Sequence, residues 1–392
     1  MKPAVRTEFL GVEGAFEVLS RARALEAQGR HIVHLEIGEP DFPTPAHIVA
    51  AAKKALDDGH THYGPTMGLP QLREAVAANV ASTRGINVEP GQVCVTPGAK
   101  PALFYAMLAT LDKGDEVLLP DPGFPIYASL ARYLEAVPVP IPLLESRQFS
   151  FDLNYLADRL TPRTKMLILN SPHNPTGAVM QPSELQELAG MLLERDIVVV
   201  SDEIYRTIHF SNEPPMSISS VPGMAEKTII IDGFSKSHAM TGWRLGYGVY
   251  PPWLAETVSK LVVNSNSCTA SFVQWAGLAA VTGPQTECEL MVQEFHRRRD
   301  LFVRRLNGIP GFSCTVPLGA FYAYPTVVSG GKHAREVAQA LLTEAGVACL
   351  AGTAFGGTGG SSLRFSLANS LKNIELAADR IVSWMNLDPV RF

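Results

Sequence analysis

The sequence predicts an α/β protein with two domains: a large domain with a mostly parallel mixed sheet sandwiched by helices, and a smaller α+β domain. Between about residues 70 and 250, short apolar strands alternate with helical segments, which is typical of a parallel sheet covered on both faces. After about residue 280 this alternation ends. The chain has 392 residues, more than one hydrophobic core usually serves.

The segment 1–45 is expected to lie outside the main core and to pack with the small domain. A helical pattern covers residues 12–28, and a short strand follows at 32–38. The run PDFPTP then interrupts the chain before a second helix at 45–58.

The large domain is expected to cover residues 46–280. Apolar runs rich in β-branched residues predict strands at 92–96, 116–120, 137–141, 165–170, 197–202, 228–232 and 243–250. Periodic patterns predict helices at 70–83, 100–111, 125–135 and 183–195. In such a sheet the loops at the carboxyl ends of the strands form the ligand-binding edge.

The small domain is expected to cover residues 281–392. It begins with a long helix that contains the run EFHRRRDLFVRRL. Its other predicted elements are a strand pair at 312–316 and 319–325, a helix at 333–345, strands at 347–352 and 363–368, and a last helix at 372–386.

The composition is that of a soluble globular protein, with 46 % apolar and 18 % charged residues. The net charge of −5 gives no reason to expect nucleic acid or an anionic membrane as a partner. No apolar run has the length of a signal peptide core or a membrane span, so we expect a cytoplasmic protein. The five cysteines are far apart and have no CxxC spacing, which predicts reduced thiols and no metal site.

Polar and aromatic residues follow the predicted strands where a ligand would bind. Asn174 comes after strand 165–170. Asp202 ends strand 197–202, and Tyr205 lies three positions further on. Lys236 comes after strand 228–232, and Phe124 after strand 116–120. The run Gly98-Ala99-Lys100 opens a helix, whose free N–H groups would suit a phosphate. Because all these strand ends share one edge of the sheet, the set predicts a single pocket.

Each member of the set also has a simpler structural interpretation. Asp202 could cap a helix, and Asn174 before Pro175 could form a turn. Phe124 and Tyr205 could serve packing alone. We interpret His173 and His238, which lie near these loops, as structural or surface residues.

The chemistry of the set favours one cofactor. Lysine forms a Schiff base with a carbonyl, and its reactive neutral form is favoured by burial and by nearby cations such as an arginine. Arg244 lies eight positions after Lys236. A buried carboxylate, here Asp202, would keep a pyridine nitrogen protonated, which makes pyridoxal 5'-phosphate an electron sink.

Seven stretches of the chain resemble the class I/II aminotransferases, the aspartate aminotransferase-like enzymes of pyridoxal-phosphate fold type I. They occur in the family's order and spacing over nearly the whole chain. The stretches are LEIGEPDFPTP at 35–45, THYGPTMGLPQLREAVA at 61–77, VTPGAKPALF at 95–104, NSPHNPTGAV at 170–179, VVSDEIY at 199–205, GFSKSHAMTGWRLGY at 233–247 and LRFSLANS at 363–370.

The resemblance implies a role for each residue that faces the cofactor ring. Lys236 would hold the cofactor as a Schiff base, and Asp202 would pair with the ring nitrogen. Tyr205 and Asn174 would donate hydrogen bonds to the phenolic oxygen of the ring. Phe124 would stack on the ring face, where the family often has Trp or Tyr.

The resemblance also implies a phosphate site and a second subunit. Arg244 and the backbone at Gly98, Ala99 and Lys100 would hold the phosphate. The family often has a serine three residues before the lysine, but this chain has Gly233 there, and Ser235 is the nearest hydroxyl. Tyr63 would reach the phosphate in the neighbouring subunit, which implies a homodimer with shared sites.

For the substrate, the resemblance implies that Arg364 clamps the α-carboxylate as a bidentate partner, with help from the backbone at Gly38 and from Asn174. Lys100 matches a lysine that some members use for a distal carboxylate. The segment 11–16, however, lacks the basic residue that helps such members. A cis peptide is expected between Asn174 and Pro175.

The activity implied is transfer of an amino group from an L-amino acid to a 2-oxo acid by a ping-pong mechanism, with Lys236 as proton carrier. The donor could be aspartate, alanine or an aromatic amino acid. The same scaffold also carries β-eliminating lyases and ring-forming synthases. Two further hypotheses are a ligand sensor that keeps the cofactor without turnover and a nicotinamide-dependent dehydrogenase. The GGTGG run at 356–360 lacks the strand-to-helix context that a dehydrogenase needs.

Overall fold

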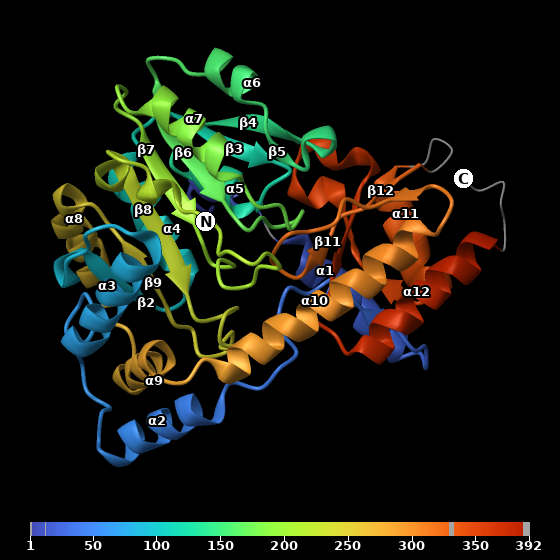
Figure 1. The fold of residues 1–392 in the computed structure, drawn as a ribbon, viewed down its shortest axis with the longest axis horizontal. Coiled ribbons are helices and arrows are strands. Elements are labelled where there is room, and N and C mark those ends of the chain that lie inside the picture. Colours follow the sequence, from blue (N-terminus) through green and yellow to red (C-terminus); the bar gives the residue numbers. More distant parts are fainter. Residues whose placement is uncertain (1, 12, 329–332, 387–392) are drawn as a thin grey trace.

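The computed structural model describes residues 2–11, 13–328 and 333–386. Val12, where the sequence places the start of the first helix, and residues 387–392 of the predicted small domain lie outside the described residues. Figure 1 shows a large sheet with helices on both sides, next to a smaller part along which the long helix α10 (Thr286–Asn307) runs.

The described residues form one eight-stranded sheet in the large part of the molecule. Neighbouring strands β3, β4, β6, β7 and β8 are parallel, whereas β9 is antiparallel to both of its neighbours and β5 is antiparallel to β4. This mostly parallel mixed sheet confirms the predicted fold class. In spatial order the strands are β2 (Val93–Thr96), β9 (Gly246–Val249), β8 (Thr228–Gly233), β7 (Val198–Asp202), β6 (Thr164–Asn170), β3 (Glu116–Asp121), β4 (Val137–Leu144) and β5 (Ser150–Phe151).

Both faces of the sheet are buried because the strands alternate their side chains between two helical layers. Val117 and Val200 pack on one side with α4, α5 and α8, whereas Leu118 and Val199 pack on the other with α7. Near β2 and β9, helices α2, α3 and α9 complete this cover. The helices of this part are α2 (Ala46–Asp57), α3 (Pro70–Arg84), α4 (Ala99–Thr110), α5 (Ile126–Tyr133), α6 (Leu153–Asp158), α7 (Pro182–Leu192), α8 (Pro252–Val263) and α9 (Ser271–Thr282).

The smaller part is held together by an aromatic core. Phe295 stacks on Phe321 with ring centroids 4.9 Å apart, and Phe302 meets Phe365 edge to face. Besides α10, its elements are β10 (Phe312–Ser313), β11 (Tyr322–Ala323), β12 (Thr326–Val327), α11 (Ala334–Ala340), a π-helical turn at Leu341–Ala345, β13 (Val347–Ala348), β14 (Leu350–Ala351), β15 (Leu363–Ser366) and α12 (Leu371–Asn386).

The N-terminal segment touches both parts of the molecule. A short 3-10 helix at Val5–Phe9 lies against α5, whereas α1 (Gly14–Glu26) contacts β13 and β14. Strand β1 (Val33–His34) pairs in parallel with β13. The segment therefore connects the edge of the large sheet with the smaller part. The domain boundaries near residues 45 and 280 stay a prediction.

Several elements differ from those that the sequence predicts. The strand at 32–38 is only two residues long, although Leu35 still hydrogen-bonds with Ala348 and Ser366. The strand at 243–250 pairs only over Gly246–Val249, since Arg244 has a φ of 53° that a strand does not allow. Helices α8 and α9 were not predicted. The face pattern of α9 is weak because apolar residues lie all around it, so periodicity does not reveal it.

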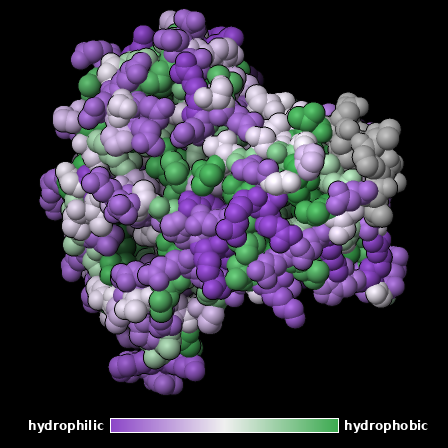
Figure 2. All heavy atoms as spheres, turned by 45° about the vertical axis from the view of Figure 1, so that its right-hand side comes forward, coloured by the Kyte–Doolittle hydropathy of each residue, from purple (hydrophilic) through white to green (hydrophobic). Residues whose placement is uncertain are grey.

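The surface is mixed in character. Figure 2 shows hydrophilic residues over most of the visible face, with apolar residues scattered among them. Among the described residues, no helix combines the length and the apolar character needed to cross a bilayer.

Candidate active site

The register of the large sheet brings the predicted site residues to one edge. Asp202 pairs with Asn170 of β6, and Gly233 pairs with Gly246 of β9, which itself pairs with Thr96 of β2. Each of these residues stands at the end of its strand. The loops that carry Asn174, Lys236, Arg244 and the start of α4 therefore leave the sheet side by side.

A cavity of about 530 Å³ opens at this edge. Its volume suits a cofactor together with a small substrate. The predicted site residues that line it are Gly38, Ala99, Lys100, Phe124, Asn174, Asp202, Tyr205, Ser235, Lys236, Arg244 and Arg364.

Two predicted site residues do not line this cavity. Gly98 lies directly behind its wall, in contact with Arg244. Tyr63 is 92 % exposed and borders a second, open cavity together with His62 and Cys268. The structure therefore brings together the residues predicted from one subunit and leaves Tyr63 on the surface.

Lys236 reaches into the cavity from the loop after β8. Its Nζ donates a hydrogen bond to the carbonyl oxygen of Gly38, 198 positions away in the chain. Burial lowers the pKa of Lys236 to about 8, against the opposing effect of Glu39, and Arg364 and Lys100 lower it further. A sizeable fraction of this amine is thus neutral, and so nucleophilic, near physiological pH.

Asp202 lies at the end of β7 with its carboxylate in the same cavity. The hydroxyl of Tyr127 donates a hydrogen bond of 2.6 Å to Oδ2, and the backbone N–H of Ile204 donates one to Oδ1. Burial raises the pKa of Asp202 to about 6, whereas these two hydrogen bonds lower it. No α-helix starts at Asp202, which excludes a role as a helix cap. The carboxylate is positioned to meet a cationic group.

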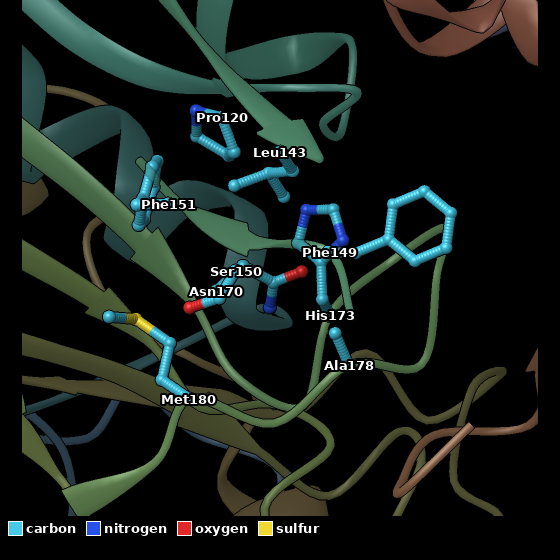
Figure 3. Close-up of a pocket in the computed structure, with 9 residues that line it drawn as sticks. All are labelled: Pro120, Leu143, Phe149, Ser150, Phe151, Asn170, His173, Ala178 and Met180. Atoms are coloured by element: carbon cyan, nitrogen blue, oxygen red, sulfur yellow. The ribbon is translucent and has the colours of Figure 1, made fainter. Parts of the chain in front are cut away.

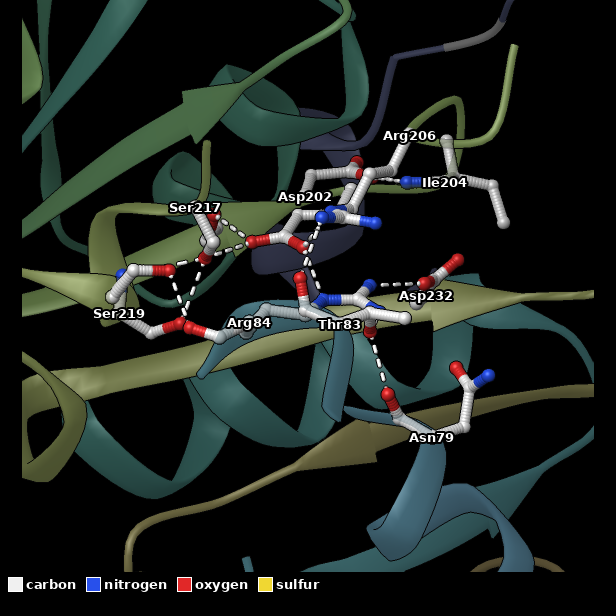
Figure 4. A network of polar contacts seen from close by, with 12 residues as sticks. Asn79, Thr83, Arg84, Asp202, Ile204, Arg206, Ser217, Ser219 and Asp232 are labelled. Carbon is white, nitrogen blue, oxygen red and sulfur yellow. Dashed lines mark hydrogen bonds and ion pairs between the residues drawn. The ribbon is translucent and has the colours of Figure 1, made fainter. Parts of the chain in front are cut away.

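A network of buried charges supports the ends of β7 and β8 (Figure 4). Arg84 bridges Glu203 and Asp232, with N–O distances of 3.0 and 2.7 Å. Ser217 donates a second hydrogen bond to Glu203, and Tyr247 donates one to Asp232. Since Glu203 follows Asp202 and Asp232 precedes Lys236 by four positions, this network fixes the two strand ends from which the cavity residues project.

The start of α4 lies close to Arg244 at the edge of the cavity. Gly98 has a φ of 89°, and a Cβ there would lie 2.3 Å from Nη2 of Arg244. A Cβ at Gly246 would lie 2.5 Å from the backbone nitrogen of Ala99. No side chain caps the first N–H groups of α4, which leaves them for a ligand. Only glycines allow the arginine and the helix terminus to approach this closely.

Arg364 forms the opposite wall. Its Nη1 donates to Oδ1 of Asn174 at 3.2 Å, and its Nη2 donates to the carbonyl oxygen of Glu36. The guanidinium carbon lies 4.6 Å from the ring centroid of Tyr322, whose hydroxyl is 2.8 Å from that of Tyr205. Among the described residues, Nε of this buried arginine has no hydrogen-bond partner. An unpartnered guanidinium N–H in a buried position is a receptor for a carboxylate.

The loop of Asn174 has the predicted cis peptide between Asn174 and Pro175, and that prediction is confirmed. Its neighbour His173 borders a separate small cavity with Asn170 and Ser150 (Figure 3). Burial lowers the pKa of His173 to about 3, so the imidazole is neutral. Nδ1 lies 2.9 Å from Oγ1 of Thr176, which agrees with a structural role.

The sequence analysis missed several residues that line the cavity, among them Tyr127, Tyr322 and Glu13. Tyr127 lies only three positions after Phe124, and that spacing on a helix start is the signal that could have found it. Tyr322 and Glu13 have no local signal, because they reach the cavity through tertiary packing.

None of the five cysteines is among the residues that line the cavity. The five cysteines are free, and three of them are buried. Across residues 2–11, 13–328 and 333–386, no cluster of three or more His, Cys, Asp or Glu side chains is arranged to hold a metal ion.

The comparisons with known proteins identify the family. The model of the family described as aminotransferase class I and II matches residues 30–381. The chain belongs to this family.

Similar proteins show what the family members do. The chain is 39 % identical over 391 residues to an aspartate aminotransferase of Geobacillus stearothermophilus, covering 98 % of this chain and 99 % of that protein. It is 38 % identical to aromatic-amino-acid aminotransferase 2 of Thermococcus litoralis, covering 91 % and 92 %. The structure of the Thermus thermophilus aspartate aminotransferase with maleate superposes with a TM-score of 0.93 at 35 % identity, covering 98 % and 100 %.

The protein is therefore an aminotransferase with the fold of pyridoxal-phosphate fold type I, a family that uses pyridoxal phosphate. These similarities do not favour a β-eliminating lyase.

Proposed function

We propose that this cavity binds pyridoxal 5'-phosphate, that Lys236 holds it as a Schiff base until substrate binds, and that the protein moves an amino group from an L-amino acid to a 2-oxo acid. The observation that supports this most strongly is the joint presence of an amine whose pKa is lowered to about 8 and a buried carboxylate in one cavity. The amine can form a Schiff base with the aldehyde of this cofactor, and the carboxylate can pair with its pyridine nitrogen.

The residues present fit the cofactor in three places. The uncapped start of α4 and Arg244 suit its phosphate, with Ser235 in the same wall. Asp202, fixed by Tyr127, suits the pyridine nitrogen. Phe124 lies at the face of the cavity, where a ring could stack on it.

The bound cofactor would supply an electron sink for the bonds at the substrate α-carbon. Asp202 would keep its ring nitrogen protonated. Tyr205 and Asn174 would donate hydrogen bonds to its phenolic oxygen. Each of these side chains is buried and already held by a neighbour, so little reorganisation is needed on binding.

Lys236 would carry the proton. After the substrate amine has displaced it, the neutral lysine can take the proton from the substrate α-carbon as a base and deliver it as an acid. Its lowered pKa serves both roles near neutral pH. Arg364 would hold the α-carboxylate, and the backbone of Gly38 lines the same cavity.

We further propose a homodimer. Tyr63 is a predicted cofactor contact that lies outside the cavity and is 92 % exposed, which is what a residue serving a neighbouring subunit's phosphate would show. Its neighbourhood at His62, Cys268 and Ser271 is an open concave surface. The measurement for this claim is the mass in solution by light scattering.

The half-reaction tests the proposed function. Purified protein loaded with pyridoxal phosphate is mixed with a panel of L-amino acids without an acceptor, and the absorbance of the cofactor is followed. We expect stoichiometric conversion to the amine form and release of one 2-oxo acid for each active site. Sustained release of pyruvate and ammonia would instead reveal a lyase.

A further inference from the structure

An ion pair stands in the wall of the cavity between residues from distant segments. The carboxylate of Glu13 accepts a hydrogen bond from Nζ of Lys100. Glu13 precedes α1, whereas Lys100 belongs to the first turn of α4, and both line the cavity. Nothing in the proposed function uses these two side chains.

The pair lines the cavity, and Glu13 does not serve as a helix cap. Glu13 stands at the N-cap position of α1, yet its side chain makes no capping bond. Nζ of Lys100 lies 5.6 Å from the ring centroid of Phe124. The side chains of Glu13 and Lys100 are 25 % and 49 % exposed, so the pair borders the open side of the cavity.

The wall beside the pair is apolar. Ala15 and Phe16, from the first turn of α1, line the cavity together with Ile37. Phe16 is 62 % exposed although it is a large aromatic residue. A neutral substrate side chain can rest on this surface and leave the ion pair intact.

The charge of Glu13 also reaches the centre of the site. It raises the pKa of Lys236, after the stronger effects of burial, Glu39, Arg364 and Lys100. Glu13 also raises the pKa of Arg364, whereas burial, the dominant effect, lowers that pKa. A second carboxylate that entered the cavity would therefore meet repulsion from Glu13 while Lys100 is already neutralised.

We propose that Glu13 is a specificity-determining residue that lowers the preference of this aminotransferase for acidic side chains. This inference rests on the proposed function. An acidic substrate must displace Glu13 before it can pair with Lys100, whereas a neutral substrate of similar length meets no such penalty. The substrate class favoured by the wild-type cavity is accordingly that of neutral, apolar amino acids.

The test compares L-glutamate with L-methionine, which have similar lengths and differ in charge. We expect Glu13→Gln to raise the ratio of kcat/KM for glutamate over methionine by about tenfold, because a like charge is removed from the cavity. The dicarboxylate maleate should also inhibit the variant more strongly than the wild type. Maleate binding needs no turnover, so it is an independent readout.

Glu17→Gln is the matched control. Glu17 lies one turn further along α1, is exposed, and stands outside the cavity lining, so the same charge change there should leave the ratio unchanged. Glu13→Ala is the second variant, and it should shift the ratio in the same direction.

An unchanged ratio in both Glu13 variants, or an equal shift in Glu17→Gln, would overturn the inference while the wild type still transaminates. If the wild type converts neither amino acid nor any other of the panel, the proposed function itself fails.

Discussion

Asp202 and Glu203 are neighbours in the chain, buried to a similar degree, but their surroundings differ. Glu203 is saturated: Arg84 pairs with one of its oxygens, and Ser201 and Ser217 donate to the other. Asp202 receives one hydroxyl and one backbone N–H, and its carboxylate faces the cavity.

The difference extends to the whole of each region. In the network of Arg84, Glu203 and Asp232, each charged group pairs with other protein groups. The network therefore stabilises the ends of β7 and β8. In the cavity, burial lowers the pKa of Lys236, and Nε of Arg364 has no hydrogen-bond partner among the described residues, so protein groups satisfy these two cations only in part. Buried charges that pair with one another indicate a structural role. Buried charges that are only partly paired and border a cavity indicate a ligand-binding role.

The largest effect is expected from the cavity lysine. Lys236→Ala removes both the covalent attachment and the proton carrier, so we expect transamination to fall by at least about a thousandfold. The fold should persist, because within the described part of the chain the Lys236 side chain makes a single hydrogen bond, to Gly38. The measurement is steady-state turnover alongside circular dichroism. Near-normal turnover would show that the cavity is not the reaction centre.

The second-largest effect is expected from Asp202, the acid that faces the cavity. Asp202→Ala should weaken binding of pyridoxal phosphate and lower kcat by about a hundredfold, because the ring nitrogen loses its partner in a buried site. Titration of the cofactor by absorbance and turnover at saturating cofactor separate the two contributions. An unchanged rate at saturation would place the cofactor elsewhere.

The neighbouring acid should respond in the opposite way. Glu203→Gln leaves Arg84 short of a charge, so we expect the free energy of unfolding to fall by about 3–5 kcal/mol. The protein that remains folded should keep kcat within about threefold of the wild type. Urea denaturation of the cofactor-free protein measures the first quantity. A large loss of kcat with normal stability would contradict the assignment of a structural role to Glu203 and a functional role to Asp202.

The smallest effect tests how Asp202 is held. Tyr127→Phe removes a hydrogen bond that lowers the pKa of Asp202, so that pKa should rise above its value of about 6. The carboxylate would then become protonated at a higher pH, and cofactor affinity should begin to fall at a higher pH on acidification. At pH 8 the rate should drop only about fivefold. Identical pH profiles for the two proteins would show that Tyr127 has no influence on Asp202.

The sequence predicts the parts of the site that strand ends determine. Asn174, Asp202 and Lys236 each follow an apolar strand, and the parallel sheet brings such positions together whatever the distance along the chain. The fold class follows from the same alternation. Residues 98–100 are also recognisable as a candidate anion site, since glycine before a helix start is a local pattern.

The remaining features depend on long-range packing and have no local pattern. Glu13 meets Lys100 across 87 positions, and Tyr322 meets Tyr205 across 117. Arg84 lies 119 positions from Glu203. Such contacts are determined by how distant segments of the chain pack on one another, and the periodicity of a single sequence does not encode that geometry.

The central claim is that Lys236 carries the cofactor, and chemical trapping tests it most directly. The protein loaded with pyridoxal phosphate is reduced with borohydride, which fixes the linkage as a stable amine, and is then digested and analysed by mass spectrometry. We predict a single phosphopyridoxyl group on the peptide that contains Lys236. Modification of another lysine, with the Lys236 peptide unmodified, would contradict the account.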